Sequence, residues 1–260
     1  MAKTPLLRHG LESLWRLAYP EQCVVCGRVL GLEERHVCPP CRAGLPWIGP
    51  DACPRCGEVV GPHSATEGGC AACRGRPFAF TRAAAPFRYD GVVRDLLLEF
   101  KLGRKSSLAY VLGDFLCDYL AEGGLSQAVD LIVPVPLHWW RRAQRGFNQA
   151  RLLALEIARR FKLPVARGVL VRRRATVSQT QFSGLRRTSN VRGAFAVRVA
   201  SANGSVLRRA VARLRGAVDL LGQRVLLVDD ILTTGSTADE CARVLREAGA
   251  REVVVATVAR

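Results

Sequence analysis

Alternating apolar and polar segments predict a chain that passes between strands and helices over most of its length. Short apolar runs at residues 130–135, 222–228 and 251–258 are typical of buried strands. Apolar residues recur at helical spacing in four further segments: 89–101, 106–121, 145–161 and 236–249. Strands that alternate with helices indicate an α/β fold with a largely parallel sheet and right-handed crossovers.

The first 20 residues have a different pattern. Leucines recur at helical spacing between Leu6 and Leu17, which predicts an amphipathic helix packed on the body of the protein. Arg8 and Arg16 interrupt the apolar positions, so the segment lacks the continuous apolar core of a signal peptide. No apolar run approaches the length of a membrane span. We therefore expect a cytoplasmic protein without a transmembrane segment.

Most of the cysteines of the chain form closely spaced pairs. Eight of the ten lie in four Cys-x-x-Cys pairs, which are Cys23/Cys26, Cys38/Cys41, Cys53/Cys56 and Cys70/Cys73. Without an export signal, such pairs suit a metal better than disulfides. Two pairs make one tetrahedral thiolate site, so four pairs predict two structural zinc ions. Spacing alone leaves sequential and interleaved ligation open. His36 and His63 could each replace a thiolate, but we interpret them as loop residues.

These patterns divide the chain into three predicted parts. Residues 1–20 are the amphipathic helix, residues 21–76 are a double zinc ribbon, and residues 77–260 are the α/β domain. The ribbon region is rich in Gly and Pro and too short for a large core, so metal ligation would supply its folding free energy. The remaining cysteines, Cys117 and Cys241, fall in predicted helices and are interpreted as core thiols.

The most informative segment joins the apolar run that ends at Val228 to the next predicted helix. Asp229 and Asp230 follow the strand, and two adjacent acids there are costly without a polar partner. A loop of small residues comes next, formed by Thr233, Thr234, Gly235, Ser236 and Thr237. Amides of such a loop, with the helix N-terminus, suit a phosphate. The two carboxylates suit the vicinal hydroxyls of a neighbouring sugar.

A resemblance to a known family rests on this segment and on a second one. Four apolar residues, two acids, two apolar residues and Thr-Thr-Gly-Ser-Thr resemble the phosphoribosyl pyrophosphate (PRPP) loop of type I phosphoribosyltransferases. Residues 134–149 contain two prolines, a basic loop and the motif Arg-Gly-Phe-Asn-Gln. With the cysteine pairs, the whole chain resembles the ComF family, also called GntX-like, of competence-associated proteins. The resemblance implies a type I phosphoribosyltransferase-like parallel sheet flanked by helices, with a small N-terminal double zinc-ribbon domain.

The resemblance implies how PRPP would be held. Asp229 and Asp230 would bind the ribose hydroxyls, directly or through Mg²⁺ that arrives with PRPP. Loop 233–237 would bind the 5′-phosphate. Some purine phosphoribosyltransferases carry an acidic base three positions after the second acid, where this chain has Thr233. An intrinsically nucleophilic acceptor such as an amine is therefore favoured.

The pyrophosphate side of the site is also implied by the resemblance. Leu137 and His138 would belong to a pyrophosphate loop that extends to Trp140. Three basic residues in the same segment would offset charge on the departing pyrophosphate: Arg141, Arg142 and Arg145. The alternative is that these arginines form a solvated helix face.

Two further basic segments have open interpretations. Residues 172–192 are rich in Arg, Ser, Thr and Gln and resemble the mobile hood that closes over PRPP in this fold. The alternatives are a plain surface loop or a nucleic-acid contact. Residues 198–219 contain five arginines among apolar residues, four of them between positions 208 and 215, and are interpreted as an insertion, which either binds phosphates or is a solvated helix.

The charge balance gives two hypotheses for function. Lys and Arg outnumber Asp and Glu by 39 to 22, a net charge of +17, which suits phosphorylated substrates, nucleic acid or an anionic membrane surface. Part of this excess could reflect a GC-rich genome. The first hypothesis is a PRPP-dependent transferase acting on an amine or base and linked to DNA uptake.

The second hypothesis is a non-catalytic competence protein that binds single-stranded DNA and uses the PRPP-type pocket for binding or sensing. Competence-machinery proteins would be partners in either case. Trp139 and Trp140 could stack on bases beside the neighbouring arginines. We favour slightly the alternative in which the two tryptophans pack between the zinc ribbons and the sheet.

Overall fold

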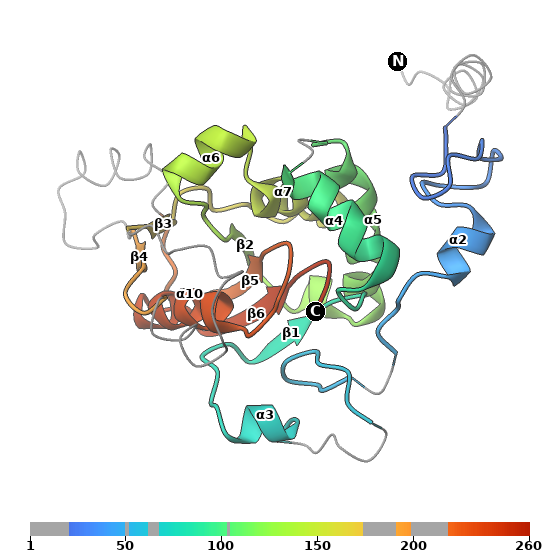
Figure 1. Ribbon diagram of the computed structural model, residues 1–260. Coiled ribbons are helices and arrows are strands. Elements are labelled where there is room, and N and C mark those ends of the chain that lie inside the picture. Colours follow the sequence, from blue (N-terminus) through green and yellow to red (C-terminus); the bar gives the residue numbers. More distant parts are fainter. Residues whose placement is uncertain (1–20, 50–51, 62–67, 103–104, 174–190, 199–217) are drawn as a thin grey trace, which may run out of the picture. The chain divides into compact units, whose positions relative to one another are not determined.

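The computed structural model describes residues 21–49, 52–61, 68–102, 105–173, 191–198 and 218–260 (Figure 1). The predicted N-terminal helix, the centre of the predicted hood and most of the predicted basic insertion lie outside this part of the chain. Two compact units are present, residues 1–46 and 47–260, and each is described by itself. Among the described residues, no helix has both the length and the apolar character needed to cross a lipid bilayer.

The first unit holds the first two cysteine pairs. An antiparallel bridge joins Gln22 to Val29, and the short helix α2 spans Pro39–Ala43. Gly27 has φ of 74° and donates its N–H to the carbonyl of Cys23 at 2.9 Å. This left-handed conformation, which glycine adopts without strain, closes the turn around the first pair.

A parallel sheet forms the centre of the second unit. Its order is β1–β6–β5–β2, with β1 at Arg82–Ala84, β6 at Glu252–Ala256, β5 at Arg224–Val228 and β2 at Leu131–Pro134. All three strand pairs are parallel, which confirms the predicted fold class. Pro134 pairs with Val228, so β2 and β5 end side by side.

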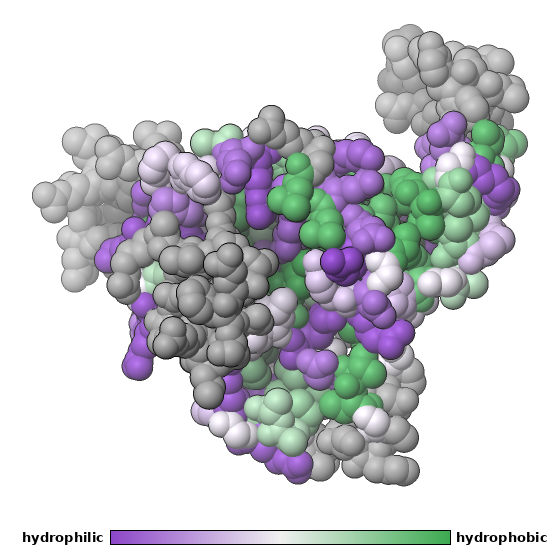
Figure 2. Space-filling model, viewed as in Figure 1, coloured by the Kyte–Doolittle hydropathy of each residue, from purple (hydrophilic) through white to green (hydrophobic). Residues whose placement is uncertain are grey.

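Helices cover both faces of this sheet (Figure 1). Val225 and Leu227 share one buried cluster with residues of α10, the helix that spans Ser236–Glu247. Side chains alternate along a strand, so the residues between them face the opposite side. Three helices lie on that side, namely α4 (Gly91–Leu102), α5 (Leu108–Glu122) and α7 (Gln149–Phe161). In Figure 2, hydrophobic residues of α4 and α5 reach the surface among hydrophilic ones.

The helix predicted over residues 145–161 begins four residues later than predicted, and a further helix lies in the segment predicted as a basic loop. The helix α6 spans Trp139–Arg145, and α7 begins only at Gln149. Gly146 has φ of 83°, which interrupts the helical backbone. Asn148 is the N-cap of α7, and its side chain accepts a hydrogen bond from the amide of Arg151 at 3.4 Å. Gly146 thus ends the helical conformation of α6, and Asn148 begins α7.

An antiparallel hairpin was not predicted from the sequence. Strand β3 (Leu170–Arg172) pairs with β4 (Phe195–Val197), and the predicted hood lies between them. Three-residue strands carry too little alternation to be recognised. Helix α10 packs against β4, which places the hairpin on the α10 side of the sheet.

Two cysteines outside the four pairs lie in the core of the second unit. Cys117 and Cys241 are 2% and 0% exposed. Burial raises the pKa of Cys117 to about 12 and raises that of Cys241 well above its ordinary value. Both thiols therefore stay protonated and apolar, as predicted.

Candidate functional site

The eight paired cysteines form two compact sets of thiols, in chain order. One set is Cys23, Cys26, Cys38 and Cys41, and the other is Cys53, Cys56, Cys70 and Cys73. Within each set the sulfur atoms all lie within 4.8 Å of one another, and all eight are free thiols. The two pairs of each ribbon are therefore sequential rather than interleaved.

The geometry of both sets fits a tetrahedral metal. A tetrahedron with metal–sulfur bonds of about 2.3 Å has edges of roughly 3.8 Å. The Sγ atoms of Cys26 and Cys38 are 3.7 Å apart, and those of Cys56 and Cys70 are 3.8 Å apart. The amide of Cys70 also points at the sulfur of Cys53 from 3.2 Å, as amides do around metal-bound thiolates.

The second ribbon belongs to the same compact unit as the parallel sheet. Its backbone is joined to β1 by a hydrogen bond from the amide of Ala83 to the carbonyl of Arg55, at 2.8 Å. Arg55 also donates to the carbonyl of Phe78 at 3.3 Å. The carboxylate of Glu58 pairs with Arg260 at 2.8 Å. This ribbon is thus built into the domain that carries the acidic pair.

Asp229 and Asp230 lie directly after β5. Asp230 is only 8% exposed, and its amide donates to the carboxylate of Asp229 at 2.9 Å. Burial, followed by the negative charge of Asp230, raises the pKa of Asp229 to about 7. The pair therefore stores electrostatic strain that a cation or a set of hydroxyl donors would relieve.

Lys101 is a member of the site that the sequence did not reveal. It lies at the end of α4, and its Nζ is 3.2 Å from a carboxylate oxygen of Asp230. Both side chains are largely buried, so this ion pair is shielded from solvent. A lysine that ends a helix 129 positions before its partner carries no recognisable motif.

Loop 233–237 leaves several backbone amides without a protein acceptor. In the described part of the chain, no acceptor contacts the amides of Thr233, Thr234 or Gly235. Gly235 has φ of 75° and serves as the N-cap of α10. Free amides next to a helix N-terminus form a site for an anion such as phosphate.

Two arginines hold the opposite, carbonyl side of this loop. Arg76 donates to the carbonyl of Thr234 at 3.1 Å and to the Oγ of Ser236 at 3.2 Å. Arg260 donates to the carbonyls of Leu232, at 3.1 Å, and of Thr233. Because the carbonyls point toward these guanidinium groups, the amides of the same peptide planes are left for a ligand.

Asp239 is the only acid in the first turn of α10, and it is already engaged. Its carboxylate accepts from the amide of Ala79 at 2.7 Å and lies 3.6 Å from Arg76. Together with Thr233 at the position of the acidic base, this leaves the loop without a free carboxylate among the described residues. The site does not supply a general base from loop 233–237.

The predicted pyrophosphate segment follows β2, beside the acidic pair. The amide of Val135 donates to the carbonyl of Val228 at 2.9 Å, which fixes Leu137 and His138 near the end of β5. Arg145 donates to the side chain of Gln149 at 3.3 Å, so part of its hydrogen-bonding capacity is used at the start of α7. The side chains of two other predicted residues lie outside the described residues: Arg141 and Arg142.

The two tryptophans of α6 are not packed as predicted. Trp139 is 72% exposed and Trp140 is 58% exposed. A seven-residue helix that stands on the surface cannot bury both rings at adjacent positions, because successive side chains point about 100° apart. Within the unit of residues 47–260, the two rings are therefore not packed between the second ribbon and the sheet, which corrects the slightly favoured interpretation.

Comparisons with known proteins agree with this architecture. Residues 14–76 match the family model of the double zinc ribbon domain, and residues 148–260 match that of the phosphoribosyl transferase domain. The DNA utilization protein YhgH of Escherichia coli K12 is 29% identical over 243 residues, with 92% of this chain and 96% of that protein covered.

Two further relatives have competence names. Competence protein F of Haemophilus influenzae is 27% identical over 244 residues, covering 92% of this chain and 96% of that protein. Competence protein ComFC of Bacillus subtilis is 25% identical over 225 residues, covering 83% and 80%. Among solved structures, the glutamine PRPP amidotransferase of B. subtilis aligns with 58% of this chain at 25% identity and a TM-score of 0.33. That alignment spans 26% of the amidotransferase.

The fold, the site and the family models define a class: a phosphoribosyltransferase-fold domain preceded by a double zinc ribbon. The chain belongs to the ComF family, as its paired cysteines and acidic loop predicted.

Proposed function

We propose that the chain binds PRPP at the end of β5. The observation that carries this proposal is the juxtaposition of free amides at Thr233, Thr234 and Gly235 with the adjacent carboxylates of Asp229 and Asp230, which follow β5 directly. The amides would hold the 5′-phosphate, with help from the hydroxyls of the loop. The carboxylates would accept hydrogen bonds from the two ribose hydroxyls.

The pyrophosphate would extend toward the end of β2. Leu137 and His138 would border it, and Lys101 could exchange its pairing with Asp230 for a contact with a ligand oxygen. Charge on the leaving group would be offset by the basic segment that contains Arg141, Arg142 and Arg145. Mg²⁺ bound with PRPP would add positive charge between the pyrophosphate and the ribose.

We further propose that the site transfers the phosphoribosyl group to a nitrogen of an amine or a base. The bond from C1′ to the pyrophosphate oxygen would break as the bond from nitrogen to C1′ forms. An amine that is already deprotonated in solution needs no base in the site and would lose its extra proton to water afterwards. This preference follows from the engagement of Asp239 and the presence of Thr233.

A pyrophosphate-release assay tests the transfer. Zinc-loaded protein is mixed with Mg²⁺ and PRPP, and free amines and nucleobases are supplied one at a time. Release above the acceptor-free rate, lost in an Asp229→Asn/Asp230→Asn variant, supports transfer. Release that persists in that variant would assign the signal to another source.

We propose that each ribbon holds one structural zinc ion through its four thiolates. The sulfur spacing near 3.8 Å in both sets supports this assignment. Two zinc ions per chain in a metal assay of reduced protein is the expected result.

A second candidate function is favoured by the exposure of Trp139 and Trp140 and by the net charge of +17. We propose that the chain acts in DNA uptake, with α6 stacking on bases of single-stranded DNA. The names of the relatives, which refer to competence and DNA utilization, support this context and imply partners among competence proteins.

Titrations with single-stranded DNA at several salt concentrations test this second function. Affinity should fall steeply with salt and drop severalfold in Trp139→Ala/Trp140→Ala. DNA binding by α6 would be contradicted if the affinity did not change with salt. It would also be contradicted if the variant bound DNA as tightly as the wild type.

A further inference from the structure

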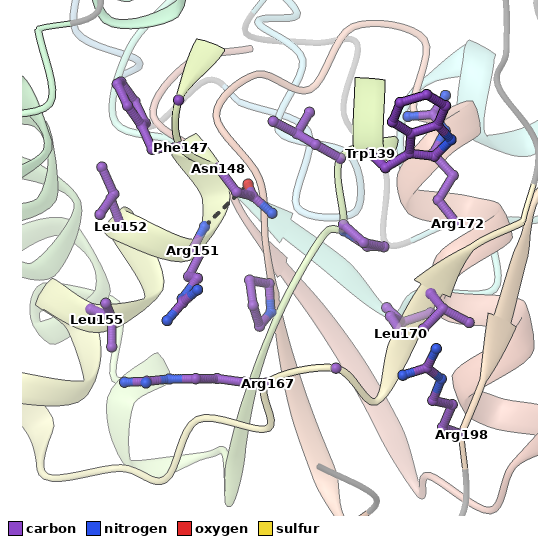
Figure 3. Close-up of a pocket in the computed structure, with 16 residues that line it drawn as sticks. Trp139, Phe147, Asn148, Arg151, Leu152, Leu155, Arg167, Leu170, Arg172 and Arg198 are labelled. Carbon is purple, nitrogen blue, oxygen red and sulfur yellow. Dashed lines mark hydrogen bonds between the residues drawn. The ribbon is translucent and has the colours of Figure 1, made fainter. Parts of the chain in front are cut away.

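A cavity of about 650 Å³ lies beside the end of β2 (Figure 3). Its walls are the segment after β2, the first turns of α7, the chain leading into β3, and the residue after β4. None of its described lining residues belongs to loop 233–237 or to the acidic pair. This volume is within the range of small-molecule sites in proteins, about 300–1,000 Å³.

Four arginines from three separate segments line this cavity. Figure 3 shows Arg151 and Arg167 on the α7 side and Arg172 and Arg198 on the hairpin side. The lining contains no aspartate and no glutamate. Four guanidinium groups around one space repel one another unless an anion lies between them.

Three of these arginines also differ from many others on the surface. In the described part of the chain, no carboxylate lies within ion-pair distance of Arg151, Arg167 or Arg198. Elsewhere, exposed guanidinium groups pair with acids at 2.5–3.6 Å: Arg28, Arg94, Arg159, Arg160, Arg224 and Arg243. Among the described residues, these three guanidinium groups are therefore left without an ion-pair partner.

Helix α7 adds a further positive contribution. Its N-cap Asn148, with Gly146 and Phe147 before it, lines the cavity, so the positive end of a 13-residue helix faces this space. Asn148 also donates to the carbonyl of Val135 at 3.0 Å. This hydrogen bond ties the helix start to the end of β2 and keeps the cavity preformed.

Apolar side chains make up the rest of the lining. They include Leu137, Leu152, Leu155 and Leu170, together with the exposed ring of Trp139. An inorganic anion would leave this apolar surface in water. A ligand that joins one phosphate to a flat ring would use both parts, because rings stack on tryptophan and phosphates pair with arginine.

We propose that this cavity is a second binding site, which takes a free nucleoside monophosphate. The phosphate lies between the arginines of the α7 side and those of the hairpin side, and the base lies against Trp139 and the leucines. The site goes beyond PRPP binding, because its four arginines are distinct from Asp229, Asp230 and loop 233–237, although it shares Leu137 and Trp139 with the segment predicted to border the pyrophosphate.

The test is calorimetric titration of the zinc-loaded full chain with AMP. The cavity variant is Arg167→Gln/Arg198→Gln, which removes two exposed guanidinium groups from opposite walls. The control is Arg82→Gln/Arg251→Gln, which makes the same charge change at the other ends of the strands. AMP affinity should fall at least tenfold in the cavity variant and stay unchanged in the control.

A third variant separates this proposal from PRPP binding. Asp229→Asn/Asp230→Asn should keep AMP binding and lose PRPP binding. AMP binding lost in this variant but kept in the cavity variant would assign AMP to the PRPP-type site and overturn the proposal. No AMP binding by the wild type would also overturn it, whatever PRPP does. A short oligodeoxynucleotide could also bind more tightly than AMP and lose affinity in Arg167→Gln/Arg198→Gln. That result would overturn the proposal of a free nucleotide and identify the ligand of the cavity as nucleic acid.

Discussion

The guanidinium of Arg76 lies 3.2 Å from the Oγ of Ser236, although 160 positions separate the two residues in the chain. Arg76 follows the last cysteine pair of the second ribbon, and Ser236 begins α10. The second ribbon therefore contacts the loop proposed to hold the 5′-phosphate. A cysteine-rich segment and a ligand loop, usually treated as separate modules, form one structural element here.

Replacing Arg76 should weaken PRPP binding without unfolding the protein. Arg76→Ala removes hydrogen bonds to Thr234 and Ser236, and charge-assisted bonds are each worth roughly 1.5–3 kcal/mol. We expect Kd for PRPP to rise about 10- to 100-fold by calorimetry. Arg74→Ala, an exposed neighbour on α3 (Ala71–Arg74), is the matched control. Equal affinity of the two variants would show that Arg76 does not shape the loop.

The two ribbons should differ in their effect on the ligand site. Cys56→Ser disrupts the second ribbon, which is followed by Arg76, a hydrogen-bond donor to loop 233–237. The substitution should therefore lower zinc content by one ion per chain and weaken PRPP binding. Cys41→Ser, in the other unit, should lower zinc content equally and leave PRPP affinity unchanged. Hydrogen exchange of residues 232–236 should quicken only in Cys56→Ser. Loss of PRPP binding in both variants would contradict the distinction.

Gly235 should be irreplaceable for ligand binding. A Cβ at this position would meet the ring of Phe78 at 3.0 Å, in addition to the strain of φ at 75°. Gly222 has nearly the same φ, 73°, with open space around it. Gly222→Ala should therefore lose about 1–2 kcal/mol of stability in denaturant unfolding, and Gly235→Ala should lose at least as much, because its Cβ also contacts Phe78. Only Gly235→Ala should lose PRPP affinity, and an equal loss in both would point to strain alone.

Asp229 should make the protein less stable as pH rises. Its pKa is raised in the folded state to about 7, so the folded protein holds a proton that the unfolded chain releases near pH 4. The favourable contribution is complete below about pH 4 and is lost as pH rises to about 7. Asp229→Asn should thus raise Tm by a few degrees at pH 8 and by less at pH 5. A gain that is the same at both pH values would contradict the raised pKa.

Asp130 should make the protein less stable as pH falls, which is the opposite pH dependence to that of Asp229. Hydrogen bonds from Arg224 lower the pKa of Asp130 to about 2, so its stabilising effect is complete above pH 4 and is lost as pH falls toward 2. The pair is about one-third exposed, which limits its worth to less than roughly 1 kcal/mol. Asp130→Asn should lower Tm slightly at pH 7, and thermal unfolding should show no difference at pH 2.

Local sequence predicted those parts of the molecule that are encoded in contiguous residues. The apolar run before Asp229 gave the central strand, and the four cysteine pairs gave the two thiol sets. Lys101, Arg76 and Arg260 could not be found this way, because only the folded sheet brings them to the loop and the acidic pair. The helix α6 was missed because seven residues are too few to show an apolar period, and the exposure of Trp139 depends on that helix.

The measurement that tests the central claim most directly is calorimetric titration of zinc-loaded protein with PRPP and Mg²⁺. The wild type is compared with Asp229→Asn/Asp230→Asn. We predict saturable binding with one PRPP per chain, lost in the double variant. Absence of heat with the wild type, or equal binding by both proteins, would contradict a PRPP site at the end of β5.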